Sequence, residues 1–130
     1  MDKSPIRPEA QKIARVHRGE IYLVSFDPTV GHEIKKTRPA LVIQNDVGNR
    51  YGPLTIVAAI TSKLSAVLNP VEVIVQPSRA NGLDLLSAIC LDQVRTVDKQ
   101  RLLRRLGRAE TSTIEKVDEA IRISLGLIAM

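Results

Sequence analysis

The chain has 130 residues but little aromatic content, with no tryptophan and with Tyr22, Phe26 and Tyr51 as its aromatic side chains. Modules that bind single-stranded nucleic acid commonly stack bases on a row of aromatic rings. So few rings nearly exclude a site of that kind. The hydrophobic core must therefore be built from aliphatic side chains.

Cysteine and long apolar segments are also scarce. The single cysteine, Cys90, excludes an internal disulfide and a thiolate metal cluster within one chain. It fits a reducing cytoplasm, where we expect the protein to reside. The longest apolar stretches, such as Leu54 to Ile60, fall far short of the roughly 20 residues that a membrane-spanning helix needs. The N-terminal segment also lacks the apolar core of a signal peptide, so we expect no contact with a membrane.

Several catalytic signatures are missing from the sequence. It contains no glycine-rich phosphate loop, no HExxH motif, and no local group of His, Asp and Glu at metal-ligand spacing. We therefore expect no metal and no cofactor. The two histidines, His17 and His32, leave little for a Ser-His-Asp arrangement.

What is present suits one globular domain. Of the residues, 44% are hydrophobic, and 19 Lys and Arg against 14 Asp and Glu give a net charge of +5. The first 18 residues hold Pro5, Pro8 and five basic against two acidic side chains, which is a charge of +3. We predict a flexible basic arm over residues 1–17 and a single domain over residues 18–130.

The remaining chain has the pattern of several short strands followed by one helix. Turn residues such as Asp27-Pro28, Pro77 and Asn81-Gly82 separate the apolar runs. The first two strands should form a hairpin around a polar loop that runs to Arg38, and the second and third should be central. The predicted strands cover residues 20–26, 40–44, 54–60, 71–75, 85–91 and, more weakly, 103–109.

The C-terminal segment has helical periodicity. Apolar residues recur at spacings of 3, 4, 4 and 3, at Ile114, Val117, Ile121, Leu125 and Ile128. Ser112 and Glu115 form a capping-box pattern that would start this helix. The apolar stripe is interpreted as core or dimer surface. Together these elements predict a mainly β fold of the α+β class, a small closed or half-closed barrel flanked by a helix.

The loop and strand entry over residues 31–39 combines an imidazole, a carboxylate and three cations. Arg38 precedes Pro39, which favours an extended backbone and presents the guanidinium from a stiff position. Its planar fork of donors matches phosphate oxygens. The alternative is a surface or salt-bridging arginine. Lys35 and Lys36 fit a solvated loop face.

A second basic segment runs from Arg95 to Arg108, where six cations against Asp98 give +5 in fourteen residues. It suits a footprint for RNA or for an acidic protein partner, or equally a solvated strand edge that discourages aggregation. Cys90, between Ile89 and Leu91, is predicted to be an inert core thiol.

From Arg18 to Ile128 the chain resembles the MazF/PemK toxin endoribonucleases. The resemblance rests on RGEIY, TRPALVIQND, AAITS, LDQVRTVDKQRL and KVDEAIRISLGLI, in the order and spacing of that family. It implies an SH3-like barrel of the MazF/CcdB type that forms a homodimer. It also implies an mRNA interferase that cuts single-stranded RNA at a short sequence, is neutralised by a cognate acidic antitoxin, and binds DNA as the toxin-antitoxin complex.

The resemblance also implies the roles of individual residues. Arg38 of the RP block and Thr61 at the end of the AAIT strand correspond to the catalytic pair of the family. Glu33 corresponds to a loop glutamate that supports catalysis or contacts substrate. Where many members have a Ser-Glu-Gln-Gly-Gly loop, this chain has a more cationic sequence from His32 to Lys36. The supporting or RNA-binding candidates are therefore His32, Glu33, Lys35, Lys36, Ser62 and Lys63.

Cleavage of RNA without a metal uses the neighbouring 2′-hydroxyl as nucleophile, and leaves a 2′,3′-cyclic phosphate and a 5′-hydroxyl. Donors such as Arg38 and Thr61 would stabilise the negative charge that develops at the phosphate in the transition state. Each such donor typically lowers the activation free energy by about 3 kcal/mol. Arginine is a poor general base because its pKa lies above about 12, so the base stays unassigned. His32 is a candidate base, or else a solvated loop residue. Thr61 without the resemblance would be an ordinary strand terminus.

A second functional class is a non-catalytic toxin or binding module on the same barrel, such as a CcdB-like gyrase inhibitor. The RP and AAIT blocks favour the endoribonuclease.

Overall fold

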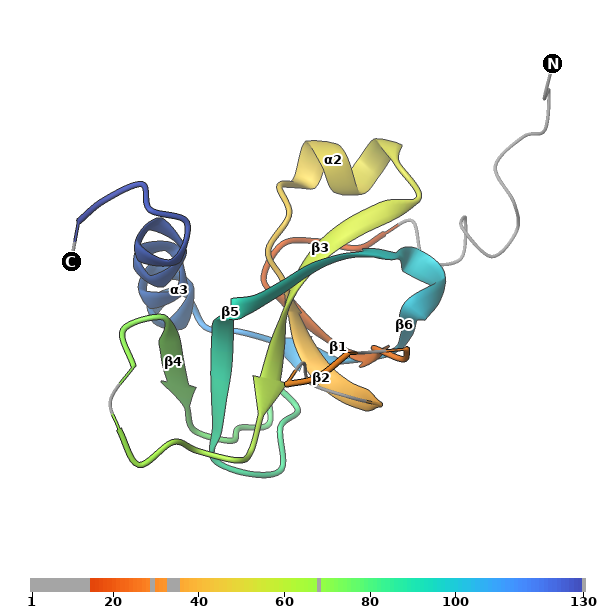
Figure 1. The fold of residues 1–130 in the computed structure, drawn as a ribbon. Coiled ribbons are helices and arrows are strands. Elements are labelled where there is room, and N and C mark those ends of the chain that lie inside the picture. Colours follow the sequence, from red (N-terminus) through yellow and green to blue (C-terminus); the bar gives the residue numbers. More distant parts are fainter. Residues whose placement is uncertain (1–14, 29, 33–35, 68, 130) are drawn as a thin grey trace, which may run out of the picture.

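The computed structural model describes residues 15–28, 30–32, 36–67 and 69–129 (Figure 1). Within these residues the chain forms six strands, two α-helices and one short 3-10 helix. In chain order they are β1 (Glu20–Ser25), β2 (Thr37–Val42), α2 (Asp46–Tyr51), β3 (Leu54–Thr61), β4 (Glu72–Val75), β5 (Ser87–Asp98), the 3-10 helix (Lys99–Arg101), β6 (Leu102–Arg108) and α3 (Thr111–Ser124).

The strands form one six-stranded sheet in the order β4-β5-β3-β2-β1-β6, with every neighbouring pair antiparallel. The predicted hairpin of β1 and β2 is present, and β2 and β3 lie in the centre as expected. A register shift interrupts the pairing of β3 with β5, where Ala58 pairs with Val94 and Ala59 with Cys90. Extra residues in one strand bend it and increase its twist. The sheet accordingly curls at β5, as Figure 1 shows.

The curled sheet separates two hydrophobic clusters. On one face, Leu41, Ile60 and Ile89 pack with Val117 of α3. On the other face, a second cluster fills the curl with buried side chains: Val24, Phe26, Val42, Val57 and Val97. Successive side chains of a strand point to opposite faces. The aliphatic runs of β2 and β3 therefore supply both clusters, which is why they read as continuous apolar segments.

The strand predictions are confirmed, with differences at the boundaries. β2 begins at Thr37, ahead of Pro39, and β5 continues to Asp98 rather than ending at Leu91. The extension pairs with residues 54–58 of β3 beyond the register shift. A sequence window with arginine and threonine among its apolar residues does not reveal that long-range pairing.

The helix predictions need two corrections. The sequence pattern predicts no helix between the strands at 40–44 and 54–60, but this segment holds α2, whose Asn45 side chain accepts a hydrogen bond of 2.8 Å from the Gly48 N–H. The capping-box prediction is wrong. α3 begins at Thr111 after Glu110, and no side chain caps it. Ser112 therefore lies inside the first turn, where it cannot act as the N-cap.

The apolar stripe of the C-terminal segment is divided by the end of α3. Val117 is fully buried, and Ile114 and Ile121 pack against the core. Leu125 and Ile128 follow the helix and are 62% and 39% exposed. The interpretation as core is therefore correct for the helical part of the stripe.

Two residues that precede the predicted domain boundary pack on the barrel. Val16 is buried in the second cluster, and the His17 N–H donates to Glu20 Oε1 over 2.7 Å. Residues 1–14 of the predicted arm lie outside the described residues. None of the helices in the described part of the chain is long and apolar enough to cross a membrane.

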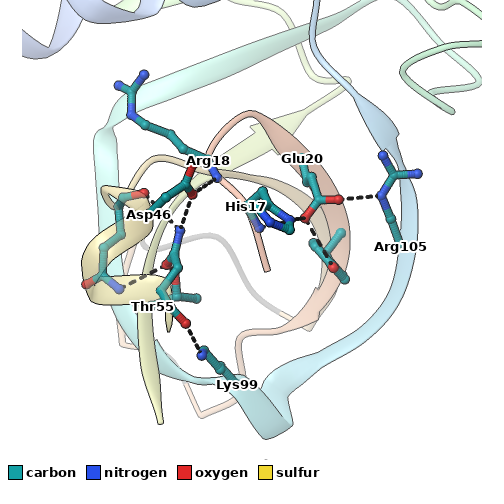
Figure 2. A network of polar contacts seen from close by, with 10 residues as sticks. His17, Arg18, Glu20, Asp46, Thr55, Lys99 and Arg105 are labelled. Carbon is teal, nitrogen blue, oxygen red and sulfur yellow. Dashed lines mark hydrogen bonds and ion pairs between the residues drawn. The ribbon is translucent and has the colours of Figure 1, made fainter. Parts of the chain in front are cut away.

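A buried polar network fastens α2 to the barrel (Figure 2). The Asn49 side chain is fully buried; its Oδ1 accepts from Thr55 Oγ1 at 2.6 Å, and its Nδ2 donates to the Gln44 carbonyl at 3.0 Å. The Lys99 ammonium donates to the Asn49 carbonyl. Burial lowers the pKa of Lys99 from its ordinary value. Lys99 of the basic segment thus has a structural role rather than a place on the surface.

Candidate active site

Arg38 lies at the start of β2 and is exposed. It pairs with Val24 of β1 on one side. On the other side, β2 pairs with β3 in the register of Ala40 with Ala59 and Leu41 with Ala58. Extending this antiparallel register by two residues places Arg38 opposite Thr61, the last residue of β3. Residues directly opposite each other share a face of the sheet, so the two candidate catalytic residues are cross-strand neighbours.

Thr61 is half-buried, and its hydroxyl Oγ1 accepts a hydrogen bond of 3.1 Å from the Lys63 N–H. This bond forms a short turn in which Ser62 and Lys63 are exposed. The hydroxyl hydrogen of Thr61 remains available to donate. The end of β3 therefore presents a hydroxyl donor at the same end of the sheet as Arg38.

A cleft of about 500 Å³ opens next to Arg38. Leu23, Pro39 and Ile60 give it apolar walls, and Arg38 and Ser62 supply polar groups from the ends of β2 and β3. The cleft also reaches the loop before β5 and the edge strand β6. Its remaining lining residues are Gly82, Leu83, Asp84, Leu85, Ser87, Arg104, Arg105 and Leu106.

The loop between β1 and β2 is closed at its base by two hydrogen bonds. The Phe26 N–H donates to the Lys36 carbonyl at 2.9 Å, and the Lys36 N–H donates to Asp27 Oδ1 at 3.0 Å. Lys36 has a positive φ of 65°, which is uncommon for a residue with a side chain. The backbone of Lys36 thus fixes the point at which the chain enters β2, two residues before Arg38.

The other candidate residues are not all gathered in the cleft. His32 and Lys36 are exposed on the loop, and they do not line the cleft, nor do Thr61 and Lys63. Glu33 and Lys35 lie outside the described residues. The structure therefore brings together Arg38 and Ser62 in the cleft, with Thr61 opposite Arg38.

Sequence reasoning missed two polar residues of the cleft, Asp84 and Ser87, and it treated Arg104 and Arg105 alike as members of one basic segment. The charge of the segment from Arg95 to Arg108 did indicate a basic surface. What the sequence did not show is that β6 pairs with β1, the neighbour of β2, so that residues of β6 and β2 line the same cleft.

Arg105 is held by a carboxylate that is almost completely buried (Figure 2). The Nε of Arg105 donates to Glu20 Oε2 at 2.7 Å, while Glu20 Oε1 accepts from the His17 N–H. Glu20 Oε1 also lies 3.5 Å from the Tyr22 hydroxyl. Burial, and after it the charge of Glu20, raises the pKa of Tyr22 above its ordinary value. Arg105 is therefore a positioned cation at the cleft rather than a free one.

Comparison with known proteins identifies the family. Residues 17–125 match the model of the PemK-like, MazF-like toxins of type II toxin-antitoxin systems. Endoribonuclease EndoA of Bacillus subtilis is 45% identical over 113 residues, which cover 87% of this chain and 97% of EndoA.

Solved structures agree with this relationship. MazF from Deinococcus radiodurans is 25% identical with a TM-score of 0.72, over 85% of this chain and 96% of that one. A mycobacterial endoribonuclease in complex with its cognate antitoxin shares the fold at 23% identity, with a TM-score of 0.72 over 88% of this chain and 99% of that one. The resemblance seen in the sequence and the predicted mainly β barrel with a C-terminal helix are thus confirmed. The chain belongs to the PemK-like, MazF-like toxin family of type II toxin-antitoxin systems.

Proposed function

We propose that the protein is a sequence-specific endoribonuclease toxin that cleaves single-stranded RNA by attack of the 2′-hydroxyl on the adjacent phosphate, without a metal or other cofactor. The observation that carries this proposal is that Arg38, which lines the cleft, lies across from Thr61 in the extended register of β2 and β3. Membership of the toxin family and the similarity to EndoA support it.

In this mechanism, the bond between phosphorus and the 5′-oxygen breaks as the 2′-oxygen bonds to phosphorus. Negative charge grows on the non-bridging oxygens in the transition state. The Arg38 fork and the Thr61 hydroxyl donate to these oxygens, and Arg38 supplies the proton for the departing 5′-oxygen and regains one from water. Preorganised donors of this kind are worth about 3 kcal/mol each. No described residue is assigned the role of general base, and the proton of the 2′-hydroxyl passes to solvent water.

The partners follow from the same proposal. The toxin works in the cytoplasm as a homodimer, and a cognate acidic antitoxin neutralises it. The free thiol of Cys90 is compatible with a reducing compartment. A CcdB-like inhibitor of gyrase is not favoured, because the curated relative and the structural relatives above carry the names of an endoribonuclease or of MazF.

The test is cleavage of a mixed single-stranded RNA in the presence of EDTA. We expect discrete fragments that end in a 2′,3′-cyclic phosphate. Arg38→Ala should lower the rate at least about 100-fold, since removal of one such donor costs about 10²–10³ in kcat. Thr61→Val keeps the shape of the side chain and should also lower kcat.

The exposed Arg108→Ala is the matched control, because it removes an equal charge outside the cleft. Cleavage by Arg38→Ala at the wild-type rate would refute the mechanism. RNA left intact by the wild-type protein would refute the proposed activity.

A further inference from the structure

The six cations of the segment from Arg95 to Arg108 do not act as one basic patch. Four of them are occupied by the protein itself. Lys99 is buried on the Asn49 carbonyl, and Arg105 pairs with Glu20. The guanidinium of Arg95 donates to the Phe26 carbonyl at 2.9 Å and lies 5.6 Å from the centroid of the Phe26 ring. Arg101 donates to the carbonyls of Ser25 and Asp27.

The two remaining cations, Arg104 and Arg108, lie on the edge strand β6 and are exposed. Neither guanidinium has a hydrogen bond or ion pair with another residue in the part of the chain that the structure describes. Their surroundings differ. Arg104 lines the cleft that contains Arg38, whereas Arg108 lines a separate hollow of about 200 Å³ with Arg18 and the start of α3.

Arg104 lies across β1 from Pro39, the residue that follows Arg38. Leu23 of β1 pairs with Pro39 of β2 on one side and with Arg104 of β6 on the other. Residues opposite each other share a face, and neighbouring strands lie about 4.8 Å apart. Arg104 therefore lies roughly 10 Å across the sheet from Pro39, the residue next to Arg38. The Leu23 side chain lies between them and lines the same cleft.

We propose that Arg104 binds a second backbone phosphate of the RNA, next to the phosphate that Arg38 contacts. This inference rests on the proposed function. An extended strand that crosses the cleft from β2 to β6 presents one phosphate to each arginine, and its bases meet the apolar walls. Arg105 adds a cation that Glu20 already compensates, and Asp84 adds one negative charge. Arg38 and Arg104 are thus the cations of the cleft without such compensation in the described residues.

A phosphate contact has a signature that separates it from catalysis. The affinity for single-stranded nucleic acid falls with salt with a slope of about −0.7 per phosphate neutralised. Loss of Arg104 should therefore weaken binding by a similar factor for all RNA sequences and reduce that slope by about 0.7. The turnover at saturating RNA should not change, because Arg104 does not contact the reacting phosphate.

The experiment uses an RNA that the wild-type protein cleaves, and a fully 2′-O-methylated copy of it that lacks the nucleophile. Binding of the copy is measured for wild type, Arg104→Ala, Arg104→Lys and Arg108→Ala across a series of salt concentrations. We expect a several-fold loss of affinity and a shallower slope for Arg104→Ala, substantial retention for Arg104→Lys, and no change in the slope for Arg108→Ala. Equal thermal midpoints would show that each variant is folded.

Equal slopes and affinities for Arg104→Ala and wild type would overturn the inference while leaving cleavage, and so the proposed function, intact. An Arg104→Ala variant that binds RNA normally but loses affinity for an acidic antitoxin peptide would also overturn it, because Arg104 would then belong to a protein interface. A wild-type protein that neither binds nor cleaves RNA would instead refute the proposed function itself.

Discussion

The Arg105 guanidinium is anchored by the Glu20 carboxylate, with Nε of Arg105 2.7 Å from Oε2 of Glu20. The Glu20 side chain is 9% exposed and that of Arg105 is 49% exposed, so the pair extends from the barrel interior to the cleft. This arrangement explains how one of two adjacent arginines can be structural while Arg104 remains available to a ligand.

Glu20→Gln tests this anchor. Because the charge is removed and the shape is kept, the variant should lose about 1–2 kcal/mol of unfolding free energy, with the exposed half of the pair limiting the loss. The pKa of Tyr22 should fall part of the way toward its ordinary value, since burial, the larger cause of its rise, remains. Tyrosinate absorbance in a Tyr51→Phe background isolates Tyr22. An unchanged Tyr22 titration would contradict the contact.

Gly82 shapes the cleft at a point where no side chain fits. It has a φ of +69°, and a Cβ there would lie 2.0 Å from the Leu106 carbonyl oxygen. Gly126 has a similar φ of +74° but open space around it. We expect Gly82→Ala to lose at least about 2 kcal/mol more unfolding free energy than Gly126→Ala, as measured by urea denaturation. Both glycines have a positive φ, but only at position 82 does the added Cβ collide with a neighbouring atom. Equal costs would contradict the close packing of β6 on this loop.

Cys90 should make stability depend on alkaline pH. Burial, and after it the charges of Glu72 and Asp92, raises the pKa of the Cys90 thiol from 9.0 to about 12. A raised pKa means that the unfolded chain loses its proton first. The contribution of the protonated Cys90 thiol to the free energy of unfolding is therefore complete below pH 9. It is lost as the pH rises toward 12, by up to about 1.4 kcal/mol per pH unit.

Urea denaturation at pH 8.5 and about pH 10.5 measures this dependence. Between these two pH values, the Cys90→Ala variant should lose less free energy of unfolding than the wild type. The Tyr22→Phe variant controls for Tyr22, which titrates in the same alkaline range. The native thiol should also react far more slowly with a disulfide reagent than the unfolded chain does. A wild type and a Cys90→Ala variant with the same pH dependence would show that the thiol is not buried in this way.

The Asn49 network should dominate the stability of α2. Asn49→Ala leaves the Thr55 hydroxyl and the Gln44 carbonyl without their side-chain amide partner, and should cost about 2–4 kcal/mol. Thr55→Val removes one hydrogen bond at constant shape and should cost about 1 kcal/mol. Combined in a double-mutant cycle, the two changes should cost less than their sum, because both remove the bond of 2.6 Å between Asn49 and Thr55. Strict additivity would show that this bond contributes nothing.

The sequence by itself determined much of the local structure. Alternating and β-branched runs predicted β1, β3, β4 and β6 nearly to their ends, and the spacing of Ile114, Val117 and Ile121 predicted α3. The RP and AAIT blocks identified the family and with it Arg38 and Thr61 as candidate site residues. These signals succeed because side-chain periodicity and turn residues act over a few positions.

The tertiary structure decided everything that depends on which strands become neighbours. Three features follow from contacts between residues far apart in the chain. They are the length of β5, the hydrogen bonds of Asn49 that hold α2 on the sheet, and the division of the basic segment into buried, paired and free cations. Arg104 and Arg105 are adjacent in the sequence and equal in charge. They differ because the sheet brings the Glu20 carboxylate to one of them and the open cleft to the other.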